Sequence, residues 1–385
     1  MTMVPLVEPH LEDPTDTSLA LTKSLPAGAR SQSYGAMVWR RFRSNRTGMI
    51  GGVLVLLLVS AVIFADFLSP YDPAARDGSQ IYMPPQAVHF VGASGFGLLP
   101  FTHPIKADVD PVTFEPTLSE DAVTECRPAL FGAGWSYDLF GLTLDRHLLT
   151  APEGCPFHLL GTDRDGRDML ARLLQGSRLT LFMAAFVVGV ATLVGTVVGV
   201  VSGYARGAVD HWIQRVVEFV LALPELPFYF ALVAIIPRDT SPLNVFLMLA
   251  AILACLKWAQ LAREVRGKTL AVGGLDYVKA AEAVGARPSR IVFRHVLPNV
   301  MSQVVVATTL MIPSIVLLES FLSFLGLGVQ PPLISWGLLL NAGQDLQTLG
   351  SYPWVLSPIG AILITVLGFN MLGDGLRDAM DPYHS

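Results

Sequence analysis

The feature that most constrains the fold of this chain is an uncharged apolar run from Leu179 to Val201, 23 residues long. An α-helix needs about 20 apolar residues to cross the hydrocarbon core of a bilayer. The run therefore predicts a membrane-spanning helix. Composition agrees, because 52% of the 385 residues are hydrophobic and only 15% are charged, whereas ordinary soluble domains carry about 25% charged residues.

Five further apolar runs reach spanning length, so we expect an all-α polytopic membrane protein with six transmembrane helices. The first run begins at residue 48 and is longer than the roughly 7 to 15 residues of a signal-peptide core, so we expect it to remain as an anchor. A tail (1–47) precedes it, an insert (71–178) follows it, and a core (179–385) holds the other five spans. The predicted spans are 48–68, 179–201, 219–236, 243–262, 300–327 and 355–372.

Orientation follows from the positive charge in the short flanks of the spans. Four arginines between residues 40 and 46 precede the first span, which predicts a cytoplasmic N-terminus and, after six crossings, a cytoplasmic C-terminus. The segment 263–299 is then also cytoplasmic and holds seven Lys or Arg, whereas residues 326–354, on the other side, hold none. The insert is predicted to be extracytoplasmic.

Two patterns inside the spans predict how the helices meet. Gly195, Gly199 and Gly203 recur every four residues and therefore lie on one helix face, which favours close helix packing over a glycine-lined pore. In the third span, Pro224 and Pro227 flank Glu225. Prolines free backbone carbonyls, which are tolerated in a membrane only where protein or water covers them. We therefore expect this helix to face a partner or a cavity, and Glu225 is a candidate for the translocation path.

Glu319 lies deep in the fifth predicted span, where a carboxylate is costly and is by default a functional-site candidate. Two interpretations remain open at this stage. Glu319 is either part of a transport path or a hydrogen-bonded group that holds the bundle together.

The insert is too long for a simple connection and carries several aromatic residues, so we expect a small folded cap. Cys126 and Cys155 both lie in it, on the predicted oxidising side, and their cross-link would contribute roughly 3 kcal/mol. The alternative is two free thiols. Cys255 lies in the fourth span, where we expect a buried small apolar residue. Three cysteines make no zinc module, and no metal site is expected.

The predicted cytoplasmic segment 263–299 contains a short helix from Asp276 that ends at Gly285, a residue suited to a left-handed cap. Tyr277, Ala281 and Val284 are predicted to share one face. Pro288 then opens a second short helix that ends at Leu297 and Pro298. The first helix either presses into a partner's groove or rests on the lipid surface as an amphipathic helix.

At these residues the chain resembles the membrane subunits of ATP-binding-cassette importers, whose cytoplasmic loop carries an acid, Ala-Ala, three residues, Gly, nine residues, Ile, one residue and Leu-Pro. Two positions depart from that pattern, with Lys279 in place of the acid and His295 in place of an apolar residue. The resemblance implies an ATPase-coupling loop whose candidate residues are Asp276, Tyr277, Lys279, Ala280, Ala281, Gly285, Arg290 and His295.

The resemblance extends along most of the chain after residue 158. Segments 158–168, 322–332, 335–337 and 369–378 are similar to the C-type permeases of dipeptide and oligopeptide importers, and 84–90 resembles a longer-looped branch of them. This implies the type I importer permease fold in a bacterial inner membrane. It also implies alternating access driven by separate ATPases. The implied partners are a second, B-type permease, two ATPase domains that bind ATP and Mg, and an extracytoplasmic substrate-binding protein.

Other chemistries are weaker interpretations. No Gly-x-x-x-x-Gly-Lys-Ser/Thr loop occurs in these 385 residues, so ATP hydrolysis is expected in partner subunits and the chain is not expected to be an enzyme. Basic residues form only short clusters, so no nucleic acid is expected. A stand-alone ion- or proton-coupled transporter using Glu319 is the main alternative. A membrane-embedded hydrolase using Asp163, Asp165 and Asp168 is a further one.

The predicted topology can be tested by thiol labelling in intact cells. A cysteine that replaces Asn45 should resist an impermeant maleimide, because it lies on the cytoplasmic side, whereas one that replaces Ser119 should react. Labelling of position 45 without labelling of position 119 would reverse the orientation.

Overall fold

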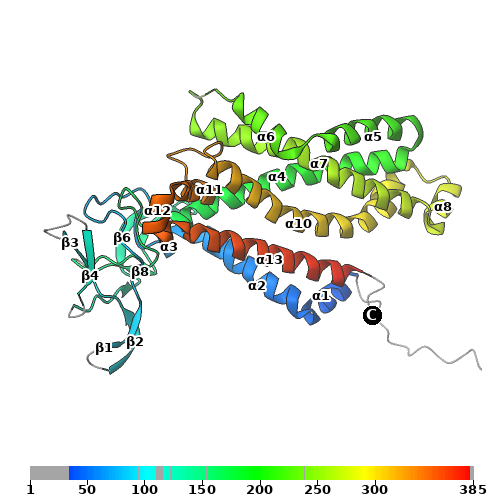
Figure 1. The fold of residues 1–385 in the computed structure, drawn as a ribbon. Coiled ribbons are helices and arrows are strands. Elements are labelled where there is room, and N and C mark those ends of the chain that lie inside the picture. The colour runs from blue at the N-terminus through cyan, green and yellow to red at the C-terminus, as the bar shows by residue number, and fades with distance from the viewer. Residues whose placement is uncertain are drawn as a thin grey trace, which may run out of the picture.

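A computed structural model of the chain describes residues 34–92, 95–109, 116–121, 124–152, 154–237 and 239–381. Long helices run side by side along most of the molecule, and the strands gather at one end of them (Figure 1). The short helix α8 (Asp276–Ala283) and helix α1 (Tyr34–Ser44) lie at the opposite end (Figure 1). Residues 1–33 of the predicted N-terminal tail lie outside the described residues. Residues 34–44 of the tail form α1.

Five helical stretches are long and apolar enough to cross a membrane, and a sixth candidate is a bent helix pair, counted over the described residues. Pro288 opens a helix as predicted, but this helix continues without a break to Phe324 instead of ending at Leu297 and Pro298. The remaining helices are α2 (Arg46–Ile63), α3 (Ala65–Leu68), α4 (Met169–Ala205), α5 (Gly207–Ala222), α6 (Glu225–Ala234), α7 (Pro242–Gly273), α9 (Pro288–Ile291), η1 (Val292–Val296), α10 (Leu297–Phe324), α11 (Trp336–Leu340), η2 (Asn341–Gln344), α12 (Leu346–Ser351), η3 (Pro353–Leu356) and α13 (Ser357–Met380).

The bent pair is α5 and α6, whose axes meet at 83° across a break at Leu223 and Pro224. Proline has no backbone N–H and cannot continue the hydrogen-bond ladder of α5. The predicted proline break in the third span is therefore confirmed. The first predicted span is also interrupted, because α2 ends at Ile63 and the short α3 follows after Phe64.

The most extensive helix contact joins α4 to α7 through the predicted glycine face. A Cβ atom added at Gly195 would lie 2.8 Å from the carbonyl oxygen of Trp258, and one at Gly199 would lie 2.6 Å from that of Ala262. One at Gly203 would lie 2.9 Å from the carbonyl oxygen of Arg266. Real Cβ atoms do not approach so closely, so only glycine allows this backbone contact. Helix packing, and not a pore, is what these glycines provide.

Helices α2 and α13 meet in the same way at a position that the sequence analysis did not single out. A Cβ atom at Gly51 would lie 2.4 Å from the backbone nitrogen of Leu372. Asn45 caps α2 by accepting from the Gly48 N–H at 2.9 Å, and its amide donates to Asp378 at 2.9 Å. The two ends of the described chain are therefore bound together beside α1.

The insert contains strands, so the all-α description is wrong for this part of the chain. Its described residues form four two-stranded antiparallel sheets, in which β1 pairs with β2, β3 with β4, β5 with β8 and β6 with β7. The strands are β1 (His89–Gly92), β2 (Gly95–Phe101), β3 (Ile105–Val109), β4 (Pro116–Glu120), β5 (Ala129–Leu130), β6 (Ala133–Leu139), β7 (Leu142–Arg146) and β8 (Leu149–Thr150).

A disulfide joins Cys126 to Cys155 within the insert, as the first of the two interpretations predicts. Cys255, by contrast, is exposed on α7, so its predicted burial is wrong. The predicted end of the insert at residue 178 lies inside helix α4. Helix α4 already begins at Met169, because the Asp168 carboxylate accepts from the Ala171 N–H at 2.7 Å and caps it.

The insert is fixed to the helices by buried polar contacts. Asp168 also contacts His158 at 2.8 Å, and both side chains are buried. The Trp354 indole donates to the Thr162 carbonyl at 3.0 Å, and the Tyr82 ring stacks on Tyr352. Because Tyr352 and Trp354 lie between α12 and α13, the insert covers the same end of the bundle as this connection (Figure 1).

The α4–α7 contact gives a matched prediction for two glycines on one helix. Gly199→Ala should destabilise the protein by roughly 1–3 kcal/mol, since its methyl group collides with a backbone carbonyl. Gly189→Ala is the control, because nothing lies within 4 Å of a Cβ there. Thermal unfolding in detergent should show a lower midpoint for the first variant only. Equal midpoints would contradict the close contact.

Candidate functional site

Helix α8 is stopped by the turn that Gly285 was predicted to make. Gly285 has φ +83°, its N–H donates to the Glu282 carbonyl at 2.9 Å, and the Ala286 N–H donates to the Ala281 carbonyl at 3.1 Å. This pair of bonds is the Schellman motif, which satisfies carbonyls at a helix end. The turn sends the chain back toward α9, so α8 bridges the ends of α7 and α10.

The inner side of α8 packs into the helix bundle. Val278 is fully buried in an apolar cluster with Val265 of α7 and Val300 of α10. On the flank, the Asn299 amide donates to the Tyr277 hydroxyl at 3.1 Å, and the Tyr277 ring lies 6.1 Å from the His295 ring. The structure therefore brings together two of the predicted coupling residues, and it binds α8 directly to both neighbouring long helices.

One side of α8 is apolar and exposed. We call Tyr277, Ala280 and Val284, which recur at the three- and four-residue spacing of one helix side, the α8 apolar face, and Phe293 of η1 is exposed as well. Val284 is exposed by 89% and Phe293 by 70%. Ala281 was predicted to lie on this face, but it is half-buried. Around the helix, Ala281 lies between exposed Tyr277 and buried Val278, which accounts for its intermediate exposure.

The charged members of the predicted loop surround this face without joining it. Asp276, Lys279 and Arg290 are all exposed. Arg287 and Arg294 are exposed as well, so the end of the bundle that carries α8 is predominantly basic. An exposed apolar patch inside a charged rim is typical of a protein interaction surface.

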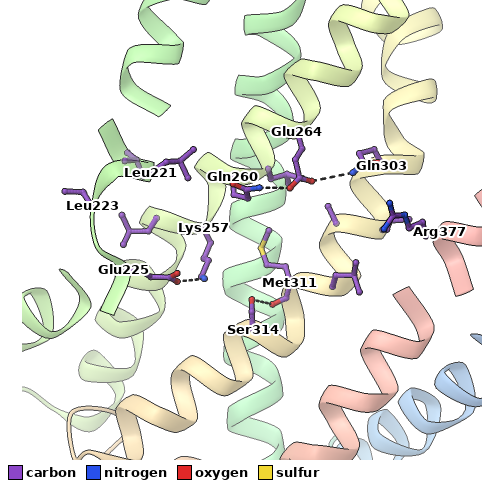
Figure 2. Close-up of a pocket in the computed structure, with 16 residues that line it drawn as sticks. Leu221, Leu223, Glu225, Lys257, Gln260, Glu264, Gln303, Met311, Ser314 and Arg377 are labelled. Carbon is purple, nitrogen blue, oxygen red and sulfur yellow. Dashed lines mark hydrogen bonds and ion pairs between the residues drawn. The ribbon is translucent and has the colours of Figure 1, made fainter. Parts of the chain in front are cut away.

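A cavity of about 590 Å³ lies farther along the bundle, between the α5–α6 break, α7, α10 and Arg377 of α13 (Figure 2). Four charged groups line it, two acidic and two basic, namely Glu225, Glu264, Lys257 and Arg377. Leucine and valine side chains fill the intervals between them. The full lining is Val220, Leu221, Leu223, Glu225, Leu256, Lys257, Gln260, Leu261, Glu264, Gln303, Val306, Ala307, Leu310, Met311, Ser314 and Arg377.

Polar contacts order the cavity wall. Glu225 forms an ion pair with Lys257 across the α6–α7 boundary (Figure 2). Glu264 accepts from the Gln260 amide at 2.9 Å and from the Gln303 amide at 3.5 Å (Figure 2). Sequence reasoning named only Glu225 among these residues. Lys257 and Arg377 could have been found from the sequence, because a charged residue within or beside an apolar span predicts a functional position.

Glu319 lies elsewhere, sealed inside the bundle with 2% exposure. Ser323 donates to one of its oxygens at 2.7 Å, and Thr180 of α4 donates to the other at 3.4 Å. The Thr180 hydroxyl in turn accepts from the Trp336 N–H at 3.1 Å. Glu319 therefore joins α10 to α4 and α11, and it does not line the cavity. Of the two interpretations, this arrangement favours the structural one.

The three aspartates of the hydrolase interpretation are engaged in structural contacts. Asp163 pairs with Arg167 at 2.8 Å and with Arg172 at 3.0 Å, and Asp165 also pairs with Arg167. Asp168 caps α4, as described above. Each carboxylate thus pairs with an arginine or caps the start of a helix at the base of the insert.

Comparison with known proteins assigns the chain to a family. Residues 195–383 match the family described as "binding-protein-dependent transport system inner membrane component". Residues 33–85 match the N-terminal transmembrane domain of oligopeptide transport permease C. The two matches together include α8, the cavity and the first long helix.

Individual relatives give the branch of the family. The chain is 31% identical over 343 residues to the oligopeptide transport system permease protein OppC of Bacillus subtilis, covering 89% of this chain and 87% of the relative. It is 42% identical to OppC of Escherichia coli K12 over 60% of this chain and 75% of the relative. It is 39% identical to the glutathione transport system permease protein GsiD of Pectobacterium atrosepticum over 58% and 72%.

The chain is therefore an inner-membrane component of a binding-protein-dependent transport system. Within that class it belongs to the C-type permeases of oligopeptide and dipeptide ATP-binding-cassette importers, as its sequence motifs predict. It is a multi-pass membrane subunit of such an importer. The alternative of a stand-alone secondary transporter is not supported, because the relatives are importer permeases and Glu319 lies outside the cavity.

The turn after α8 gives a prediction that isolates backbone conformation. Nothing lies within 4 Å of a Cβ at Gly285, so a substitution there strains only the positive φ. Gly285→Val should cost roughly 1–2 kcal/mol, whereas Gly285→Asn should cost less, because Asn adopts this conformation more readily. Hydrogen exchange in residues 276–290 should be about tenfold faster in the Val variant. Identical exchange in both variants would contradict the described turn.

Proposed function

We propose that this chain crosses the inner membrane six times, with α5 and α6 as one broken span and both termini in the cytoplasm. Two observations support this arrangement. The insert and α8 lie at opposite ends of the long helices (Figure 1), and the flanks on the α8 side carry the positive charge. The insert then lies on the extracytoplasmic side, together with its disulfide.

We further propose that the α8 apolar face is the contact with a separate ATPase subunit. This face is the observation on which the proposal depends, because an exposed valine and tyrosine on a basic, water-facing end need a partner. The alternative, a helix resting on lipid, needs a wide apolar stripe along its length. Helix α8 has only eight residues, and its inner side is already buried in the bundle.

The same helix provides a mechanical path to the cavity. Val278 packs against α7 and α10, and both of these helices line the cavity farther along. Closely packed side chains move together and do not deform gradually. A displacement of α8 by the ATPase therefore shifts two walls of the cavity together. ATP and Mg are expected on the partner subunits. ATP binds two conformations of the ATPase with different affinity, and this difference supplies the free energy that shifts the helix bundle between its outward and inward openings.

The cavity is proposed as this chain's half of the translocation path, with a B-type permease subunit as the other half. Peptides, the substrates named for the relatives, carry an ammonium group, a carboxylate and mixed side chains. Two acidic and two basic groups separated by apolar side chains suit such a ligand. Glu225 and Lys257 form an ion pair whose partners a peptide's ammonium and carboxylate can replace, and Arg377 is exposed. An extracytoplasmic binding protein would deliver the peptide at the insert end.

The ATPase contact can be tested at the most exposed position of the face. Val284→Glu places a carboxylate where we expect a dry interface, and an uncompensated buried charge costs several kcal/mol. Association of the ATPase subunits should weaken at least about tenfold, because each 1.4 kcal/mol corresponds to a factor of ten. Co-purification and peptide uptake both report the loss.

Two controls accompany this variant. Val284→Leu keeps the position apolar and should assemble and transport as the wild type does. Glu282→Gln changes a charge on the polar side of the same helix and should also have little effect. If Val284→Glu assembles normally, the α8 apolar face is not the ATPase contact.

A further inference from the structure

The hairpin formed by β6 and β7 has an apolar end that the importer function does not explain. Phe140 and Gly141 form its two-residue turn, and both have a positive φ. Two turn residues with positive φ suit the twist of a tight antiparallel hairpin. Phe140 is 83% exposed and Leu142, beside it, is 66% exposed. Exposed large apolar side chains at the tip of a hairpin are costly in water.

The hairpin is amphipathic along its length. Tyr137 faces Leu144 and Leu139 faces Leu142 on one side of the ladder, whereas Asp138 faces Thr143 on the other. The Thr143 hydroxyl donates to Asp138 at 2.8 Å, which holds the polar side together. Alternation of this kind indicates that the two sides of the hairpin meet different solvents.

The apolar side of the hairpin lies against the outer surface of α2. Leu139, Leu144 and Tyr137 line a groove of about 450 Å³ together with Leu57 and Phe64. This groove is almost entirely apolar: its lining is Leu57, Ser60, Ala61, Phe64, Phe67, Leu68, Tyr137, Leu139 and Leu144. Leu57 and Phe64 are themselves exposed, so the groove is continuous with the surface that α2 presents outward.

The hairpin tip lies at the level where the spans leave the apolar layer. Phe140 shares a second groove, of about 540 Å³, with Val62, Ile63, Arg178 and Phe182. Arg178 donates to the carbonyls of Val62 and Ile63 at 2.9 and 3.1 Å and thereby caps α2. It is also the last charge before the uncharged run of α4, so it marks the membrane boundary.

We propose that the β6–β7 hairpin is immersed at its tip in the leaflet on the insert's side, with phospholipid acyl chains filling the two grooves. Lipid is the occupant because both grooves continue the exposed apolar surface of α2 and α4, two helices that are long and apolar enough to cross a membrane. Immersion is shallow, since the outer backbone edges of a two-stranded hairpin are unpaired and cannot enter the hydrocarbon core. Phe140 and Leu142 reach into the acyl chains, while Asp138, Asp145 and Arg146 stay in the headgroup layer or in water.

This contact adds to the polar contacts of the insert with the α12–α13 connection and with α3, where the Leu148 N–H donates to the Phe67 carbonyl at 2.8 Å. The hairpin thus keeps the insert at a fixed height above the membrane, on the side where a substrate-binding protein would approach.

The proposal can be tested by spin labelling in phospholipid nanodiscs. Cys255→Ala removes the one cysteine outside the disulfide, and nitroxides are then placed through Phe140→Cys, Leu142→Cys or Asp145→Cys. Collision with oxygen should exceed collision with nickel-EDDA at positions 140 and 142, because oxygen concentrates in lipid. At position 145, five residues from the tip, the order should reverse.

Two features of the design make the result interpretable. Positions 140 and 142 are exposed, so labels there remove little packing, and peptide mapping of the Cys126–Cys155 disulfide checks that the insert has folded. If positions 140 and 142 are as accessible to nickel-EDDA as position 145 in a folded insert, the hairpin lies in water and the proposal fails.

Discussion

The rest of the structure depends on the close contact between the backbones of α4 and α7. Within a membrane no hydrophobic force drives two helices together, because lipid tails are as apolar as leucine. Association relies instead on packing, which requires close approach. Gly195, Gly199 and Gly203 provide it by leaving room for the carbonyls of Trp258, Ala262 and Arg266, one helical turn apart. The contact fixes both the rotation and the height of α7 against α4.

Helix α7 in turn positions the cavity and the coupling helix. Lys257 and Glu264 project from it into the cavity, and Val265 meets Val278 of α8. Near its end, Arg266 forms a two-pronged ion pair with Asp210 of α5, with both distances 2.6 Å. Ser202 of α4 donates to the same carboxylate at 2.5 Å. One helix therefore links the glycine contact, the broken span and the surface proposed to receive the ATPase.

Buried polar groups act as joints where apolar packing alone has little directional preference. Glu319 connects α10 to α4 and α11 through hydroxyl groups, and Arg178 connects α4 to α2 through backbone carbonyls and Asp66 at 2.6 Å. A polar group left unpaired in such surroundings costs several kcal/mol. Each joint therefore holds only when its partners are aligned, which favours one arrangement of neighbouring helices over rotated alternatives.

The sequence by itself determined the features that depend on local chemistry. Uncharged length identifies spanning helices, Pro224 breaks the third of them, and the positive φ at Gly285 follows from a glycine after a run of helix formers. The four-residue glycine spacing of α4 likewise indicates a packing face. These signals need no knowledge of distant residues, because covalent geometry and helical periodicity fix them.

Only the tertiary structure decided how equivalent local signals are used. Glu225 and Glu319 are both carboxylates in apolar segments, yet one faces a cavity and the other is sealed among hydroxyl groups of three helices. Ala280 and Ala281 are adjacent, and the packing of Val278 decides which of them faces outward. The strands of the insert and the position of Phe140 beside α2 likewise depend on pairing between distant segments. Sequence periodicity states which residues share a face, but what that face meets is fixed by the packing of the whole chain.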